Sequence, residues 1–122
     1  MKTILEFLSK DKIQQNDKVT LSKIDPWFGS FWGYQFTSSA DEISATLGIE
    51  PGIPHDPDEA KCNFMWGLRI NGGEYDGTEF TIYDRNGFSS FKLMQDFHIG
   101  SHTREDSITA YKFLKLQYNI IK

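Results

Sequence analysis

Residues 62–70 alternate between apolar side chains and smaller or more polar ones, and no other segment constrains the fold of this chain as strongly. Side chains of a strand point to opposite faces in turn. One face would therefore carry Cys62, Phe64, Trp66, Leu68 and Ile70, and the other Asn63, Met65, Gly67 and Arg69. The pattern predicts a half-buried β-strand whose apolar face other elements must cover.

The segments that follow predict two more strands of the same sheet. Turn residues rich in glycine and asparagine lead into residues 78–84, where the side chains alternate again. An antiparallel hairpin with residues 62–70 is therefore expected. A second turn at residues 85–87 precedes residues 91–99, which are the expected third strand.

Two earlier segments also have strand character. Residues 19–22 alternate between apolar and hydroxyl side chains, and residues 31–36 are aromatic around Gly33. Asp25 and Pro26 would join the two strands, because proline fixes φ and favours a turn.

Helical patterns stand on either side of these early strands. Residues 3–10 place apolar side chains at helical spacing and predict an N-terminal helix. Ser39 and Glu42 have the spacing of a capping box, and the short helix that follows would stop at Gly48. Residues 49–61 then contain three prolines, which withhold amide donors, so a long semi-rigid loop is expected there.

The C-terminal segment predicts an amphipathic helix. Thr103 and Asp106 resemble a helix cap. The apolar stripe that follows consists of Ile108, Tyr111, Leu114, Tyr118 and Ile121, with Lys112, Lys115 and Lys122 outside it. The whole pattern predicts an α+β fold, a single domain over residues 1–122. Its central antiparallel sheet would carry the N-terminal, short middle and C-terminal amphipathic helices on one face.

Composition excludes several classes of protein. The 122 residues suffice for one core, which should be aromatic-rich because the chain has ten Phe, five Tyr and three Trp. The net charge of −4 argues against direct binding of nucleic acid, which requires a basic surface. Apolar runs are too short to span a membrane and the N-terminus lacks a secretory signal, so a cytoplasmic location is expected. The lone Cys62 fits a reducing compartment and is expected to be a buried thiol.

No segment carries a catalytic or metal-binding signature, so no catalytic residue, metal or cofactor is expected. His55, His98 and His102 do not have the spacing of a zinc motif, and residues 55–58 lack the acidic spacing of a calcium loop. Ser101 lies between two histidines, which suggests a nucleophile and its base, but the glycines of a hydrolase elbow are missing. Use of these residues in a turn and a helix cap is the preferred interpretation.

One group of side chains is suited to a compact anionic or nucleotide-like ligand. If the strands pair as predicted, Arg69, Tyr83 and His98 all point away from the apolar face of the sheet. A cation, a phenol and an imidazole can bind such a ligand through charge-assisted hydrogen bonds. The candidate ligand-binding residues are Lys61, Arg69, Tyr83, Asp84 and His98. The alternative is a solvated outer face of the sheet that binds nothing.

A second group is aromatic and precedes the short middle helix. It lacks interleaved Lys or Arg, so stacking on nucleic acid bases is not favoured, and packing in the core or in an interface is. Aromatic side chains are enriched among the residues that dominate protein interfaces. The candidate partner-interface residues are Trp27, Phe28, Phe31 and Trp32.

Short motifs between residues 47 and 116 resemble those of a group of small, mostly uncharacterised bacteriophage accessory proteins. The matching segments, in order, are Leu47-Gly48, Lys61, Trp66, Phe80-Thr81-Ile82-Tyr83-Asp84 and Phe97-His98-Ile99-Gly100, followed by a closing helix. Those proteins are similar in having a Lys-then-Trp strand, a Thr-Ile-Tyr-Asp-Trp-Lys segment and a Trp-His-Ile-Gly-Gly segment. This chain departs from them at Arg85-Asn86, at Phe97 and at Ser101.

The resemblance implies an accessory protein that acts in the cytoplasm of an infected host cell. The leading expectation is a non-catalytic binding protein that inhibits host defence. It would cover a host protein with its aromatic surface, or sequester a small anionic or nucleotide signalling ligand between the protomers of a homo-oligomer. One alternative is a small hydrolase or nuclease-like enzyme in which His98 or His102 acts with Asp84 or Asp96. The other is a structural or virion-associated protein.

Overall fold

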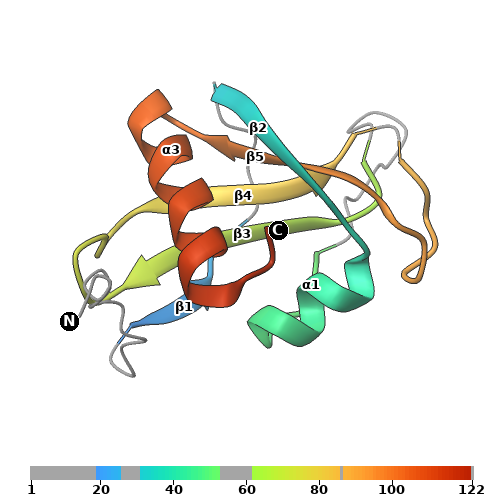
Figure 1. The fold of residues 1–122 in the computed structure, drawn as a ribbon, viewed down its shortest axis with the longest axis horizontal. Coiled ribbons are helices and arrows are strands. Elements are labelled where there is room, and N and C mark those ends of the chain that lie inside the picture. Colours follow the sequence, from blue (N-terminus) through green and yellow to red (C-terminus); the bar gives the residue numbers. More distant parts are fainter. Residues whose placement is uncertain (1–18, 26–30, 53–61, 86, 122) are drawn as a thin grey trace.

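The computed structural model describes residues 19–25, 31–52, 62–85 and 87–121, and only the backbone of residues 31–33. These residues form five strands, two α-helices and one π-helical turn (Figure 1). In chain order they are β1 (Thr20–Lys23), β2 (Phe31–Ser38), α1 (Ala40–Leu47), β3 (Met65–Asn71), β4 (Glu79–Asp84), β5 (Gln95–Ser101), α3 (Arg104–Phe113) and η1 (Leu114–Tyr118). The predicted N-terminal helix at residues 3–10 and most of the proline-containing loop lie outside the described residues.

All five strands belong to one antiparallel sheet in the order β1-β3-β4-β5-β2. The α+β class and the hairpin of β3 with β4 are therefore confirmed, as is β5 as the next strand. Gly72, Gly73 and Gly77 have positive φ in the turn of that hairpin, a conformation that glycine adopts at little cost. The two early strands are also present, but they do not pair with each other, since β1 and β2 lie at opposite edges of the sheet.

Two strand boundaries differ from the prediction. β3 begins at Met65 rather than at position 62, so Cys62 leaves the predicted apolar face and packs in a separate small cluster with Met65 and Tyr83. β5 begins at Gln95 rather than at position 91. The chain before it cannot continue the ladder, because the carbonyl of Phe91 accepts a hydrogen bond from the Asp41 amide at the start of α1 (2.9 Å).

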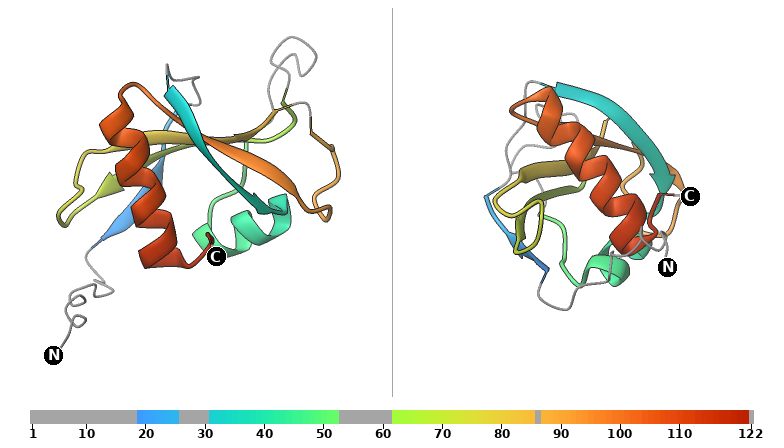
Figure 2. Two further views of the ribbon diagram at one scale, coloured as in Figure 1. Left: turned by 45° about the horizontal axis from the view of Figure 1, so that its top comes forward. Right: turned by 60° about the vertical axis from the view of Figure 1, so that its left-hand side comes forward.

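The main core lies against one face of the sheet and includes residues of both helices. The strands contribute Phe36, Trp66, Leu68, Ile70, Phe80, Ile82, Phe97 and Ile99, and the helices contribute Ala40, Ile43, Leu47, Ala110 and Phe113. α3 contacts β2, β4 and β5 and lies along one side of the sheet in both views of Figure 2. The indole of Trp66 donates a hydrogen bond to the Ile49 carbonyl (2.9 Å), so its polar atom is satisfied inside the core.

The predicted helix caps are both present. The hydroxyl of Ser39 accepts from the Glu42 amide, Gly48 ends α1 at φ 72°, and the hydroxyl of Thr103 accepts from the Asp106 amide. The predicted C-terminal stripe is largely present, since Leu114 and Ile121 are in the core and Tyr111 and Tyr118 pack against it. α3 also buries Ser107, Ala110 and Phe113, which were not predicted, and Ile120 is buried after the π-helical turn η1.

The centre of the opposite face is not solvated. Met65 of β3 and Tyr83 of β4 are buried there, and so is Thr81, two residues before Tyr83 on β4. Gly67 shares this face, and a Cβ on it would lie 2.6 Å from the Ile24 carbonyl oxygen. The expectation of a wet outer face therefore fails for this part of the sheet. Among the described residues, no helix is long and apolar enough to cross a membrane.

Candidate functional site

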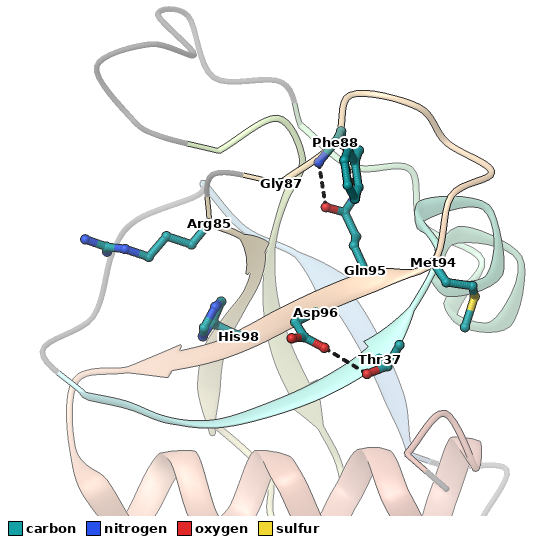
Figure 3. A pocket seen from close by; sticks show the side chains of 8 residues that line it. All are labelled: Thr37, Arg85, Gly87, Phe88, Met94, Gln95, Asp96 and His98. Carbon is teal, nitrogen blue, oxygen red and sulfur yellow. Dashed lines mark hydrogen bonds between the residues drawn. The ribbon is translucent and has the colours of Figure 1, made fainter.

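An open depression of about 440 Å³ lies where β4 leaves the sheet and β5 begins (Figure 3). β2 contributes Thr37, the start of β5 contributes Gln95, Asp96 and His98, and Arg85 follows β4 directly. The remaining lining residues, Gly87, Phe88 and Met94, come from the connection between β4 and β5, which is called the 87–94 loop below. The depression thus has a polar floor on the sheet and an apolar rim on the loop.

The floor is ordered by the pairing of β2 with β5. Thr37 lies opposite Asp96, and its hydroxyl donates a hydrogen bond to the Asp96 carboxylate (2.8 Å). His98 lies two residues further along the same strand, so both side chains point to the same face of the sheet. On the neighbouring strand Tyr83 lies opposite His98, and the two rings stack with their centroids 5.6 Å apart.

The imidazole of His98 is held towards its neutral form. Burial lowers the pKa of His98 below its ordinary value of 6.5, and the nearby guanidinium of Arg85 lowers it further, whereas Asp96 and Asp84 act in the opposite direction. Burial raises the pKa of Tyr83, so its phenol keeps its proton at neutral pH. In Figure 3, His98 lies between Asp96 and the base of Arg85, whose guanidinium extends away from the other labelled side chains.

Asp84 has a structural position that the sequence did not indicate. Its side chain is fully buried on the core side of the sheet, opposite Phe97. One oxygen accepts from the backbone amides of Asn63 and Phe64 (both 2.8 Å), and the other accepts from the side-chain amide of Asn63 (3.0 Å). Asp84 thus links the end of β4 to the chain before β3 by hydrogen bonds. This structural role takes the place of the ligand-binding role that was predicted for it.

Asn63, which binds Asp84, also fixes the start of the 87–94 loop. The Asn63 side chain also donates to the Gly87 carbonyl (2.9 Å). The side-chain amide of Gln95 then binds the backbone of Phe88 at two points, accepting from its amide (2.8 Å) and donating to its carbonyl (3.0 Å). A Cβ at Gly87 would collide with the side-chain oxygen of Gln95 and approach that of Asp84, so a larger residue there would displace the Gln95 side chain.

The middle of the 87–94 loop is held by the start of α1 and by the chain just before β3. The Phe91 carbonyl is bound by the Asp41 amide, and the Phe91 ring packs edge-on against Phe64 with the centroids 4.7 Å apart. Lys92 also lies 3.6 Å from the carboxylate of Asp41. The backbone of the loop is therefore constrained at both ends and in the middle.

This constrained loop exposes apolar side chains. Phe88 is 58% exposed, Met94 56%, Leu93 48% and Phe91 38%. Of the described residues, Leu116 at the C-terminal π-turn is the other exposed large hydrophobic side chain. One short loop thus exposes four large apolar side chains, which makes it a candidate binding surface.

The structure brings together some of the predicted ligand-binding residues and separates others. Tyr83 and His98 are in contact, but Arg69 lies opposite Glu79, four residues along β3 from the residue that pairs with Tyr83. At a rise of about 3.3 Å per residue, that places Arg69 roughly 13 Å away along the strand. Arg69 there forms an ion pair with Glu79 (3.3 Å), so it lies on the same face of the sheet as Tyr83 and His98, as predicted, but apart from them.

Five other predicted site residues give no structural outcome. Lys61, Trp27 and Phe28 lie outside the described residues, and the structure does not describe the side chains of Phe31 and Trp32. Sequence reasoning missed the 87–94 loop because residues 91–94 were assigned to a strand. The available signal was a group of apolar side chains after Asp84 that follow neither strand nor helix spacing.

The hypothesis of a serine nucleophile finds no support in the described part of the chain. Ser101 lies on the core side of β5, where its hydroxyl contacts the Thr103 carbonyl and the Ser107 hydroxyl, while His98 lies on the other face. Cys62 is buried, and burial together with Asp84 raises its pKa to about 11, so its thiol stays protonated. Among the described residues, no group of three His, Cys, Asp or Glu side chains could hold a metal ion.

Comparison with known proteins adds no assignment, since no protein-family model, curated protein or solved structure matches the chain. The function therefore has to be argued from the geometry of the depression and of the 87–94 loop.

Proposed function

We propose that this chain is a non-catalytic binding protein that recognises another protein with its 87–94 loop. The observation that carries the proposal is the combination of a constrained backbone with exposed Phe88, Leu93 and Met94 side chains. The loop and the adjoining depression lie together where β4 ends and β5 begins, and both are open to a partner.

Exposing these side chains is costly unless they are covered in a complex. Burying one large apolar side chain is worth about 1.5–3 kcal/mol. Two such side chains at the centre of an interface would supply a substantial part of the affinity of a typical complex, in which a few residues dominate.

The hydrogen bonds of the loop favour the same role. A flexible loop loses conformational entropy when it binds, and a loop that is already ordered avoids most of this cost. Both polar atoms of the Gln95 side chain are hydrogen-bonded to the backbone of Phe88, so Gln95 stabilises the conformation of the loop. The ring of Phe88 itself remains 58% exposed for contact with a partner.

The experiment compares three full-length variants. Partners are captured from cells in which the protein acts, and the partner retained by the wild type is identified and titrated by calorimetry. Phe88→Ser and Met94→Ser are expected to weaken binding about tenfold or more, as the loss of a buried apolar side chain implies. Leu116→Ser removes a side chain that is 68% exposed outside the loop and should bind like the wild type. Equal affinities of Phe88→Ser and Leu116→Ser would refute the proposal.

The resemblance to bacteriophage accessory proteins supports a narrower form of this proposal, in which the partner is a host defence protein. It is tested by asking whether expression of the wild type, but not of Phe88→Ser, protects a phage from a defence system. The hydrolase alternative would use His98 with Asp96, which line the same depression. It predicts that His98→Ala abolishes the biological effect, whereas a binding role through the loop predicts that most of the effect remains.

A further inference from the structure

β2 forms one edge of the sheet and lacks most of the features that protect an edge strand. It is the last strand of the sheet and, within the described part of the chain, pairs with β5 alone. Every second residue of such a strand directs its backbone amide and carbonyl away from the sheet, where they can pair with another strand. Natural proteins protect such edges with charged side chains, prolines, bulges or very short strands. β2 has eight residues, none of which is charged or a proline.

The two edges of the sheet differ in this respect. β1, at the opposite edge, has only four residues and ends at the exposed Lys23. β2 has one partial protection, a change of register between Phe31 and Tyr34. Residues 34–38 beyond it stay in regular register with β5. This segment, called the 34–38 edge below, is the part of β2 that is suited to accept a further strand.

The side chains of the 34–38 edge alternate between the core and the outer face of the sheet. α3 packs against the core face, where the rings of Tyr34 and Tyr111 lie with their centroids 4.9 Å apart and Phe36 is buried. Gln35 and Thr37 are exposed on the outer face. In the right view of Figure 2, β2 lies on the outside of the ribbon with α3 on its inner side. A strand added at this edge would therefore extend the sheet and continue both of its faces.

We propose that two copies of this chain associate by antiparallel pairing of their 34–38 edges, which joins the two five-stranded sheets into one. A strand that pairs with itself about a two-fold axis faces its own residues, so a charged strand would repel its copy. The 34–38 edge carries only aromatic, amide and hydroxyl side chains. Pairing centred on Phe36 uses the whole segment, because Gln35 of one copy then faces Thr37 of the other.

The second copy would also complete the wall of the depression. Thr37 lines the depression and binds Asp96, which lies beside it on β5. Directly opposed residues of an antiparallel pair project to the same face of the sheet. Gln35 of the second copy would therefore lie next to Thr37, and the floor of the depression would continue across the two-fold axis. The dimer would present two 87–94 loops on the same face of the joined sheet.

Sedimentation equilibrium of the full-length protein over a range of concentrations tests this pairing. The interface along one strand edge is small, so we expect a dimer that dissociates on dilution. Gln35→Lys adds a charge at an exposed position of the edge and should weaken dimerisation about tenfold. The matched control is Thr20→Lys, which adds the same charge at an exposed position of β1 and should leave dimerisation unchanged.

Hydrogen exchange measured by NMR supplies a second readout. In the monomer every second amide of the 34–38 edge should exchange rapidly, since it points away from β5. Dimerisation should protect these amides, because each then donates to a carbonyl of the second copy.

Three results would overturn this inference. A protein that is monomeric at every concentration and keeps the rapidly exchanging amides does not pair with itself, and its edge is available to a strand of another protein. A monomer in which all amides of the 34–38 edge are protected has this edge covered by its own chain. A dimer that persists in Gln35→Lys but is lost in Phe88→Ser associates through the 87–94 loop. The first two results leave the proposed function unaffected, because it depends on the 87–94 loop and not on β2.

Discussion

Replacing Asp84 with alanine is expected to be among the most destabilising single changes of a polar residue in this protein. Its carboxylate is fully buried and accepts three hydrogen bonds, two from the backbone amides of Asn63 and Phe64 and one from the Asn63 side chain. Alanine removes every acceptor at once and leaves the donors in place. The change also loosens the contact through which Asn63 holds Gly87.

The magnitude follows from the unsatisfied donors. Leaving a buried donor without a partner costs about 1–3 kcal/mol. The Phe64 amide is buried, whereas the two Asn63 donors are half-buried and each cost less, so the free energy of unfolding should fall by about 2–5 kcal/mol in total. That is a large part of the roughly 5–15 kcal/mol by which domains of this kind are stable. Asp84→Asn keeps one oxygen for the two backbone amides, so it should cost only about 1–2 kcal/mol.

Urea denaturation followed by tryptophan fluorescence measures both variants, with Asp96→Ala as the matched control. Asp96 is exposed and accepts a single hydrogen bond from Thr37, so its replacement should cost less than about 1 kcal/mol. If Asp84→Ala were no more destabilising than Asp96→Ala, the assignment of Asp84 as a structural residue would be incorrect, and its predicted role in binding would have to be reconsidered.

Three further outcomes are expected. Gly67→Ala should cost about 1–3 kcal/mol in the free energy of unfolding, because the new Cβ would lie 2.6 Å from the Ile24 carbonyl oxygen; a thermal melt equal to that of the wild type would contradict this close approach. Ser39→Ala should cost about 1 kcal/mol, since the Glu42 amide loses its cap, and circular dichroism during urea unfolding measures the loss. Burial lowers the pKa of His98 in the folded protein, so below about pH 6.5 the unfolded chain binds more protons than the folded chain. The free energy of unfolding of the wild type should therefore decrease as the pH falls through this range, and that of His98→Gln should decrease less. Stability curves of the two proteins that coincide across this pH range would exclude that contribution.

The parts of the fold that the sequence predicts correctly are those that depend on local patterns. The alternation around Trp66, the turn glycines and the cap at Ser39 each specify structure within a few residues, and each is present. The pairing of the early strands is a long-range property, and the local sequence of β1 and β2 does not distinguish a hairpin from two separate edges. Secondary-structure patterns therefore predicted the elements better than their arrangement.

The candidate site shows the same division. Periodicity along β4 and β5 was sufficient to place Tyr83 and His98 on one face, and they are stacked. The same periodicity puts Asp84, one residue after Tyr83, on the core side, but it could not show that the carboxylate binds the chain before β3. Nor could it show that Gln95 folds its side chain back onto Phe88, because that contact depends on the path of the loop between them.

The most direct measurement of the central claim is site-specific photo-crosslinking in cells. The photoreactive amino acid p-benzoylphenylalanine replaces Phe88 in one version of the protein and Leu116 in another, both of which are exposed positions. Recognition through the 87–94 loop predicts a crosslinked partner of one defined mass from position 88 and none from position 116. The same partner crosslinked from position 116 but not from position 88 would contradict the account.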